Sequence, residues 1–305
     1  MRMGLAGEFS GNIPGWRGGK ARVGLTMGRA FQIVFFTFAS VMLALLGWNL
    51  VAGAWTTLNW AMFAVSGICC LLAFVRFDHV FTFSYALAMS LNACLIASAR
   101  PAPVAVLLAA IAVVYGVRLS TFTWLRSRSR SYAKHVDNFA SKDAETPQGV
   151  KLMVWFATTL LYTFHAMPFY ASVSQGVLTS AILLGALIMV AGLLLEAFAD
   201  WQMQSAKSIS PERFVNRGLF TAWRHPNYFG QMILQLGLIT IGVSSVSTLA
   251  EVATASIAPI YIVVLMVFEA RRRDKEQLER YGLENEYPKY RQNSGSLLPR
   301  FRGLS

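Results

Sequence analysis

The residues best equipped for chemistry in this 305-residue chain form one run, Arg-His-Pro-Asn-Tyr-Phe-Gly at residues 224–230. The run combines a strong cation, an imidazole, an amide and a phenol, and an apolar segment begins directly after it at Gln231. Polar side chains at the edge of an apolar environment are costly to desolvate unless they bind something. The run therefore predicts a site for a polar ligand beside an apolar region.

Each residue type in this run suits a particular part of such a ligand. Pro226 fits the first turn of a helix, where its missing N–H is harmless. The free N–H groups of that turn, with Arg224 beside them, suit an anion such as pyrophosphate. Asn227 can both donate to and accept from a carboxamide, and Gly230 can admit a flat ring. The alternative interpretation is a capped helix start, held by a cation at the lipid headgroups.

A second polar group lies upstream, where Glu196, Asp200, Gln204 and Lys207 are spaced i, i+4, i+8 and i+11. This spacing places them on one stripe of a helix. An acid inside an apolar segment is a candidate functional residue, because its carboxylate can accept hydrogen bonds from ribose hydroxyls or a nicotinamide amide. Lys207 can face phosphate. The alternative interpretation is an interfacial helix end with salt-bridged, snorkelling charges.

The composition predicts that helices crossing a membrane position these groups. The chain is 55% hydrophobic and 14% charged, whereas roughly 25% charged residues is usual for a soluble domain. The net charge of +12 comes from basic residues between the apolar segments. This placement favours lipid headgroups and a phosphorylated cofactor as partners over nucleic acid. The three cysteines, Cys69, Cys70 and Cys94, lie in apolar segments and predict neither a disulfide nor a metal site.

Apolar segments define the predicted architecture, which is all-α because a backbone in lipid must satisfy its own hydrogen bonds. We expect a polytopic integral membrane protein with seven to eight transmembrane helices, eight being favoured. The second and seventh segments are the weakest, since one is short and the other contains Ser and Gly. The segments run approximately over residues 30–53, 58–75, 80–98, 103–123, 151–172, 177–199, 229–246 and 252–270.

Basic residues lie in alternate loops, with Arg100 as the exception. The positive-inside rule then places both termini in the cytoplasm. We expect three regions along the chain. Residues 1–29 would form a flexible basic tail, residues 30–125 would form the substrate side of the membrane region, and residues 126–305 would form the cofactor site.

Several motifs together resemble the steroid 5-alpha-reductase-like family, and in particular bacterial membrane reductases of the DUF1295 type. The resemblance covers roughly residues 76–300 and is strongest over 190–230. It is carried by Tyr115-Gly-Val-Arg118, Glu196-x-x-x-Asp200, Gly218-Leu-Phe, the run at residues 224–230, Glu286-Tyr-Pro-Lys-Tyr290 and Leu298-Pro299.

The resemblance implies an NADPH-dependent reductase that saturates a carbon–carbon double bond conjugated to a ketone. It implies a lipophilic substrate similar to a 3-oxo-4-ene steroid, which arrives from the bilayer of a bacterial inner membrane. The oligomeric state stays open, with a monomer as the working expectation. By resemblance, the residues that hold NADPH are Glu196, Asp200, Lys207, Arg224, His225, Asn227, Tyr228 and Arg272, the last being one choice among Arg271 to Arg273.

The reduction itself calls for a proton donor. Hydride addition to the β-carbon of an enone builds negative charge on the ketone oxygen, which a nearby donor stabilises. Tyr115, in the fourth apolar segment, is the predicted donor. Family members pair the matching tyrosine with a carboxylic acid on an earlier segment, so Asp78 is predicted as its partner, kept protonated by burial. The alternative interpretation is that Asp78 forms an ion pair with Arg76 in a loop and that Tyr115 is an aromatic residue of the core.

The chain departs from the family pattern at two places that concern the proton donor and its partners. The mammalian enzymes that the chain resembles carry a Gln-Glu pair upstream, and this chain has Asp78-His79 instead. Many relatives have Glu after the last Gly of the run, where this chain has Gln231.

The rival hypothesis is an S-adenosylmethionine-dependent membrane methyltransferase of the isoprenylcysteine or phospholipid type. Such enzymes share a motif similar to the run at residues 224–230, and they would use Arg224, His225 and a downstream acid such as Glu269. A third hypothesis is a non-catalytic sterol-binding protein. Glu196-x-x-x-Asp200 together with Tyr115-x-x-Arg118 favours the reductase.

Overall fold

The computed structural model describes residues 16–129, 132, 136–137, 141 and 143–300, with side chains from residue 31 onward. The chain divides into two compact units, Met1–Phe38 and Ala39–Ser305. The first helix, α1, runs over Trp16–Val51 and so begins before residue 30, where the predicted tail was expected to end. Residues 1–15 of that predicted tail lie outside the described residues.

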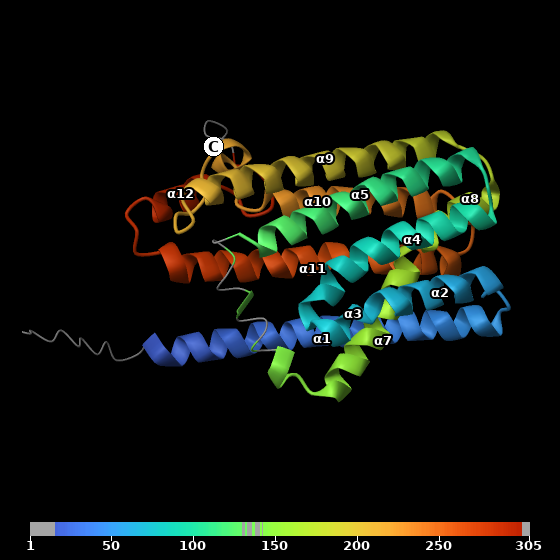
Figure 1. Cartoon of the computed structure of the whole chain (residues 1–305), viewed down its shortest axis with the longest axis horizontal. Helices are drawn as coiled ribbons and strands as arrows, with labels where there is room; N and C mark the ends of the chain where they lie inside the picture. The colour runs from blue at the N-terminus through green and yellow to red at the C-terminus, as the bar shows by residue number, and fades with distance from the viewer. Residues whose placement is uncertain (1–15, 130–131, 133–135, 138–140, 142, 301–305) are drawn as a thin grey trace, which may run out of the picture. The chain divides into compact units, whose positions relative to one another are not determined.

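Every regular element in the described part of the chain is a helix (Figure 1), which confirms the predicted all-α class. The first half continues with α2 (Thr57–Cys70), α3 (Leu72–Val75), the short 3-10 helix η1 (Phe77–Phe81), α4 (Phe83–Ala99) and α5 (Pro103–Ser127). The second half contains α7 (Gln148–His165), α8 (Met167–Gln175), α9 (Ser180–Ile209), η3 (Gly218–Thr221), α10 (Pro226–Val243), α11 (Leu249–Tyr281) and α12 (Tyr287–Asn293).

Helix length and composition indicate an integral membrane protein. Two of the eight predicted spans are not among the helices that qualify: α4 has only 17 residues, and α10 carries polar side chains such as Gln231 and Gln235 on its inner side. The count of eight spans and the side of each terminus stay predictions. In the described residues, six segments are long and apolar enough to cross a membrane: Phe31–Val51, Thr57–Val75, Pro103–Ser127, Gln148–Gln175, Ser180–Ile209 and Leu249–Tyr281.

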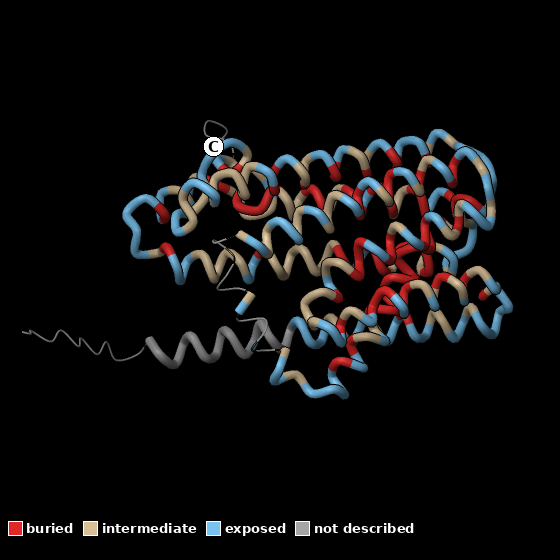
Figure 2. The backbone as a smooth tube through the Cα atoms, in the orientation of Figure 1, coloured by how far each residue is buried: buried red, intermediate tan, exposed pale blue. Residues whose placement is uncertain are grey.

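The exterior of the helices is more apolar than that of a soluble protein. Figure 2 shows the second half of α7 and most of α8 buried, whereas α5 and α9 keep an exposed face. That face carries apolar side chains such as Leu187 and Leu194 of α9 and Val117 of α5, which are more than half exposed. The interior is mostly apolar as well, but it also holds polar side chains. Apolar exteriors of this kind suit contact with lipid. The buried polar side chains include Ser66, Asn92, Thr159, His165 and Gln235.

Local sequence signals start and end the helices much as expected. A capping box of Thr56 and Asn59 begins α2, and a second one of Thr248 and Glu251 begins α11. Pro226 lies in the first turn of α10, as predicted. At the end of α8, Gly176 adopts a left-handed conformation with φ of 68°.

The closest helix contact joins α9 to α10 through glycines. A Cβ atom added at Gly192 would lie 2.5 Å from the Leu234 backbone N and 2.6 Å from the Gly230 carbonyl O. Conversely, one added at Gly230 would lie 2.6 Å from the backbone N of Glu196. The two backbones therefore touch without intervening side chains, as small residues allow in membrane helices. Gly230 serves this contact, and the flat ring expected beside it would meet the backbone of α9.

This contact gives a test of the packing. Gly192→Ala should lower the free energy of unfolding by roughly 1–3 kcal/mol, because the added methyl group overpacks a backbone contact. Gly47→Ala is the matched control, since nothing lies within 4 Å of its added Cβ and Ala favours a helix by about 0.5–1 kcal/mol. Thermal unfolding in detergent measures both variants. Equal melting temperatures for the two would contradict the described contact.

Candidate functional site

A charged cluster joins α5, α9 and the start of α10. The Arg118 guanidinium lies between two acids, with Nη1 at 2.7 Å from Glu196 Oε1 and Nη2 at 2.5 Å from Asp200 Oδ2. Asn227 Nδ2 donates to the other oxygen of Asp200 at 3.1 Å. The three ionic side chains are no more than 17% exposed. We call Arg118, Glu196, Asp200 and Asn227 the carboxylate cluster.

One oxygen of this cluster lacks a partner. Glu196 Oε2 is buried and has no hydrogen bond among the described residues. Leaving a buried acceptor unsatisfied costs about 1–3 kcal/mol, and more for a charged group. Two acids facing one guanidinium also leave the cluster with an excess of acceptors. The cluster is therefore arranged to receive N–H or O–H donors from a ligand.

A second buried cluster continues from the first and connects four helices. The Tyr115 hydroxyl donates to Gln231 Oε1 at 2.8 Å. Gln231 Nε2 and Gln235 Nε2 donate to the Tyr85 hydroxyl at 3.2 and 3.1 Å. His165 Nε2 lies 2.9 Å from Gln235 Oε1. We call Tyr85, Tyr115, His165, Gln231 and Gln235 the phenol–amide network.

The two clusters form one polar track inside apolar helices. Tyr115 lies three residues before Arg118 on α5, and Gln231 lies four residues after Asn227 on α10, so each pair shares a helix face. All five members of the phenol–amide network are buried. Polar groups at this depth are retained at a cost. Their continuity with the carboxylate cluster marks the track as the candidate functional site.

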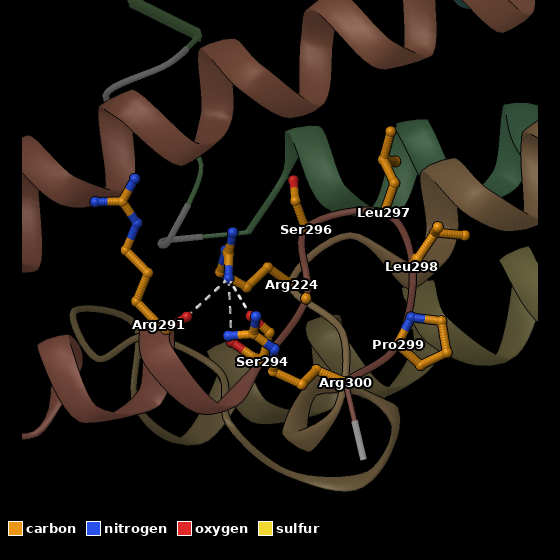
Figure 3. A pocket seen from close by; sticks show the side chains of 9 residues that line it. Arg224, Arg291, Ser294, Ser296, Leu297, Leu298, Pro299 and Arg300 are labelled. Carbon is orange, nitrogen blue, oxygen red and sulfur yellow. Dashed lines mark hydrogen bonds between the residues drawn. The ribbon is translucent and has the colours of Figure 1, made fainter. Parts of the chain in front are cut away.

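The side chains of Arg224 and His225 bind other residues of the protein. The Arg224 guanidinium donates from Nε and Nη2 to both oxygens of Asp274 on α11, at 2.8 and 3.0 Å. Its Nη1 donates to the Ser294 carbonyl at 2.5 Å (Figure 3). His225 Nε2 lies 2.9 Å from Asp274 Oδ1. These contacts occupy the donors that were predicted to face a pyrophosphate.

The C-terminal segment lies alongside the run because of these contacts. The Arg224 N–H donates to the Gly295 carbonyl at 2.8 Å, and the His225 N–H donates to the Ser296 carbonyl at 3.1 Å. A shallow pocket of about 540 Å³ opens between them (Figure 3). Leu298 and Pro299 line this pocket, together with Arg224, Arg291, Ser294, Gly295, Ser296, Leu297 and Arg300.

Two more predicted cofactor residues occupy different environments. Tyr228 stacks on His225, with ring centroids 5.4 Å apart and planes 13° apart, and the guanidinium of Arg273 lies near it. Arg272, the predicted choice among three arginines, is about half exposed and pairs with Glu269 and Glu276 of its own helix. Of Arg272 and Arg273, Arg273 is the arginine that lies beside the run at residues 224–230.

The remaining predicted residues lie apart from the track. Lys207 Nζ donates to the carbonyls of Pro211 and Arg213 and to the Tyr281 hydroxyl, so it closes the end of α9. Both oxygens of Asp78 accept from Arg76, at 3.1 and 2.9 Å, as the loop interpretation expected.

Asp78 lies in η1, and a neighbouring acid secures that segment. Asp143 Oδ1 accepts from the Phe77 N–H at 3.0 Å and pairs with Lys151 Nζ at 2.8 Å. The hydrogen bond from Lys151 holds the pKa of Asp143 below its ordinary value of 3.8. The hydroxyl of Tyr115 donates to Gln231, which takes the place that was expected for Asp78.

Sequence reasoning missed four members of the site. Tyr85, His165 and Gln235 lie in apolar segments without a motif. Asp274 lies in a run of charged residues that suggests a solvated helix face. A usable signal did exist for Gln235, because Gln231 and Gln235 are spaced i, i+4 in an apolar segment and so share one face.

The comparisons with known proteins add one finding. A family model described as a protein of unknown function (DUF1295) matches residues 75–294. The matched range contains the whole polar track and Asp274. No curated protein and no solved structure matches the chain.

The role of Asp274 as an anchor is testable. Asp274→Ala leaves Arg224 buried without its acid, which should lower the free energy of unfolding by roughly 3–5 kcal/mol. Protease cleavage within residues 294–300 should become faster, because the C-terminal segment is no longer fixed through Arg224. Glu279→Ala, at an exposed position of the same helix, is the control and should change neither measurement. Unchanged cleavage in Asp274→Ala would exclude the anchoring role.

Proposed function

We propose, since the chain belongs to the DUF1295 family of proteins of unknown function, that it is an NADPH-dependent reductase. Its reaction would saturate a carbon–carbon double bond conjugated to a ketone in a lipophilic enone, such as a 3-oxo-4-ene steroid. The observation that carries this proposal is the polar track. A cluster rich in hydrogen-bond acceptors leads directly to a buried phenol within helices that face lipid.

The carboxylate cluster fits the reduced dinucleotide. Glu196 Oε2 accepts no hydrogen bond from the described residues, so it is available to a carboxamide N–H or a ribose hydroxyl. Asp200 and Asn227 complete the polar wall. Arg126, two turns beyond Arg118 on α5, and Arg273 beside Tyr228 are cations that suit phosphate. When bound, NADPH supplies the hydride.

Arg224 and His225 take a different part in this proposal from the one expected. Their side chains are bound to Asp274, so they hold the C-terminal segment against the start of α10. In this proposal the residues that contact the cofactor are Glu196, Asp200, Asn227 and Tyr228.

Tyr115 is the proposed catalytic donor. Reduction of an enone at its β-carbon places negative charge on the ketone oxygen, and a fixed donor in a water-poor site stabilises that charge strongly. Tyr115 is 1% exposed and close to Glu196 and Arg118 along the track. Asp78 is left out of the proposal because Arg76 binds both of its oxygens.

The apolar exterior suits lateral entry of the substrate. In the proposed topology α4 and α10 also cross the membrane, both termini are cytoplasmic, and the membrane is the bacterial inner membrane. The face of α5 that carries Val106, Val114 and Val117 is exposed to lipid. A lipophilic enone can reach the buried phenols from the bilayer, while the cofactor comes from water.

The contacts of Glu269 favour the reductase over the methyltransferase. A methyltransferase of the isoprenylcysteine or phospholipid type would use this acid with Arg224 and His225. Glu269 pairs with Arg272 instead, and Asp274 is the acid that binds the two residues of the run.

Ligand-induced stabilisation tests the cofactor. NADPH at one hundred times its dissociation constant should stabilise the purified protein by about 2.7 kcal/mol, seen as a higher melting temperature. Glu196→Gln should weaken NADPH binding about 10- to 100-fold, as for a lost hydrogen bond to a charged group. Glu284→Gln, at an exposed position, should bind NADPH normally. Stabilisation by S-adenosylmethionine alone would overturn the reductase proposal.

Turnover tests the donor. Tyr115→Phe should lower kcat for NADPH oxidation with a 4-en-3-one steroid about 10²- to 10³-fold and leave the affinity for NADPH unchanged. Tyr170→Phe removes a hydroxyl that contacts Thr56 at a distance from the track, and it should keep the wild-type kcat. Full activity of Tyr115→Phe would remove Tyr115 from the mechanism.

A further inference from the structure

The hydroxyl of Tyr115 has only one proton, and in this structure the protein itself uses it. The proton is donated to Gln231 Oε1 at 2.8 Å. While it points there, the Tyr115 oxygen can accept a hydrogen bond but cannot donate one to a ligand. A carbonyl at this site therefore needs a second arrangement of the hydrogen bonds around Tyr115.

The side-chain amide of Gln231 can provide that arrangement while the rest of the side chain stays in place. Rotation by 180° exchanges Oε1 and Nε2, which lie 2.8 Å from the Tyr115 hydroxyl and 3.2 Å from the Tyr85 hydroxyl. After the rotation, Gln231 Nε2 donates to Tyr115 and Oε1 accepts from Tyr85. A phenol hydroxyl can donate or accept, so both contacts persist and the proton of Tyr115 becomes free.

The rest of the phenol–amide network supports both orientations. Gln235 Nε2 donates to the Tyr85 hydroxyl at 3.1 Å in either case, and Gln235 Oε1 faces His165 Nε2 at 2.9 Å. In the second orientation the donors run in one direction from His165 through Gln235, Tyr85 and Gln231 to Tyr115. The two orientations keep the same contacts, so an added hydrogen bond to a ligand can select between them.

We propose that Gln231 is a positioning residue with two amide orientations, and that a ligand carbonyl selects the one in which Tyr115 donates to it. The proposal rests on the proposed function for the identity of that carbonyl. It gives a physical role to an amide at this position, because an amide always offers one donor and one acceptor. An ionised carboxylate offers only acceptors and would hold the protons of both phenols.

Two titratable groups hydrogen-bond directly to Gln231, namely Tyr85 of α4 and Tyr115 of α5. The other titratable groups of the adjoining polar track are Arg118 of α5, His165 of α7 and Glu196 of α9. Titration of these groups is common to the wild type and to a variant at Gln231. The ratio of variant kcat to wild-type kcat at each pH therefore reports only the titration of the side chain at position 231.

Gln231→Glu is the decisive variant. Its new carboxyl can donate to Tyr115 only while protonated, so the ratio of variant to wild-type kcat should fall tenfold for each pH unit above the pKa of that carboxyl. A purely structural role predicts a loss that does not depend on pH. Gln148→Glu, the same exchange at an exposed position, is the matched control, and its ratio should be constant.

The infrared band of a bound carbonyl supplies a measurement independent of turnover. The probe is a 4-en-3-one steroid labelled with ¹³C at the ketone, bound without NADPH. Donation by Tyr115 should lower the C=O frequency in the wild type relative to Tyr115→Phe. In Gln231→Glu the low frequency should appear at acid pH and be lost as pH rises.

Gln231→Leu provides a second variant in case Gln231→Glu does not fold. Leucine cannot hold the proton of Tyr115, so Tyr115 is free to donate to the ligand carbonyl at every pH. Because the proposal has Gln231 release that proton when the carbonyl binds, the C=O band of Gln231→Leu should match the wild-type band. A lower C=O frequency in Gln231→Leu than in the wild type would show that Gln231 keeps the proton of Tyr115, and it would overturn the proposal.

The outcomes separate this proposal from the proposed function. If the wild type oxidises NADPH with the enone and the Gln231→Glu ratio is independent of pH, the two-orientation proposal is wrong and the reductase stands. If the wild type neither binds nor oxidises NADPH, the proposed function is wrong. The C=O band of the bound steroid then still decides whether Gln231 controls hydrogen-bond donation by Tyr115. An identical C=O band in all variants overturns the two-orientation proposal.

Discussion

The direct backbone contact between α9 and α10 determines where the functional side chains meet. Gly192 and Gly230 leave no room for a Cβ atom between the helices, and the backbone of Glu196 rests on Gly230. This contact brings the acids of α9 level with Asn227 and Gln231 of α10. In a membrane, where apolar burial drives helix association weakly, such close packing is an important source of specificity. The polar track therefore depends on glycines that carry no chemistry of their own.

Charge inside the protein is handled by pairing across helices. Arg118 of α5 lies between two acids of α9, and Asp274 of α11 binds both Arg224 and His225. A buried ion is tolerable only when such partners are fixed in place. The two arrangements differ in one respect that matters for function. Arg224 donates to Asp274 and to the C-terminal segment, whereas Glu196 Oε2 of the carboxylate cluster has no partner in the part of the chain that the structure describes. The first arrangement suits an anchor and the second a binding site.

The phenol–amide network explains how a neutral group can stand where the resemblance suggested an acid. Gln231 offers a donor and an acceptor at once, so it can serve both Tyr115 and Tyr85 without a buried charge. Tyr85 comes from the helix before Tyr115, the region in which a carboxylic acid was expected. The expected partner, Asp78, lies in η1 with Arg76. A pair of phenols joined by an amide thus replaces the phenol–acid pair that the resemblance suggested.

The sequence by itself determined the helical membrane class, most helix boundaries and the spacing of Glu196 and Asp200, because apolar periodicity, capping residues and proline act locally. It also located the run at residues 224–230. Only the tertiary structure decided which side chains meet: Arg224 with Asp274, Arg118 with both acids, and Gln231 with two phenols. Each of these contacts joins residues from different parts of the chain. A periodic pattern indicates which face of a helix is polar, but it does not indicate which neighbouring helix that face contacts. Between α9 and α10 that choice follows from the glycine contacts, which fix how these two helices are aligned along their lengths.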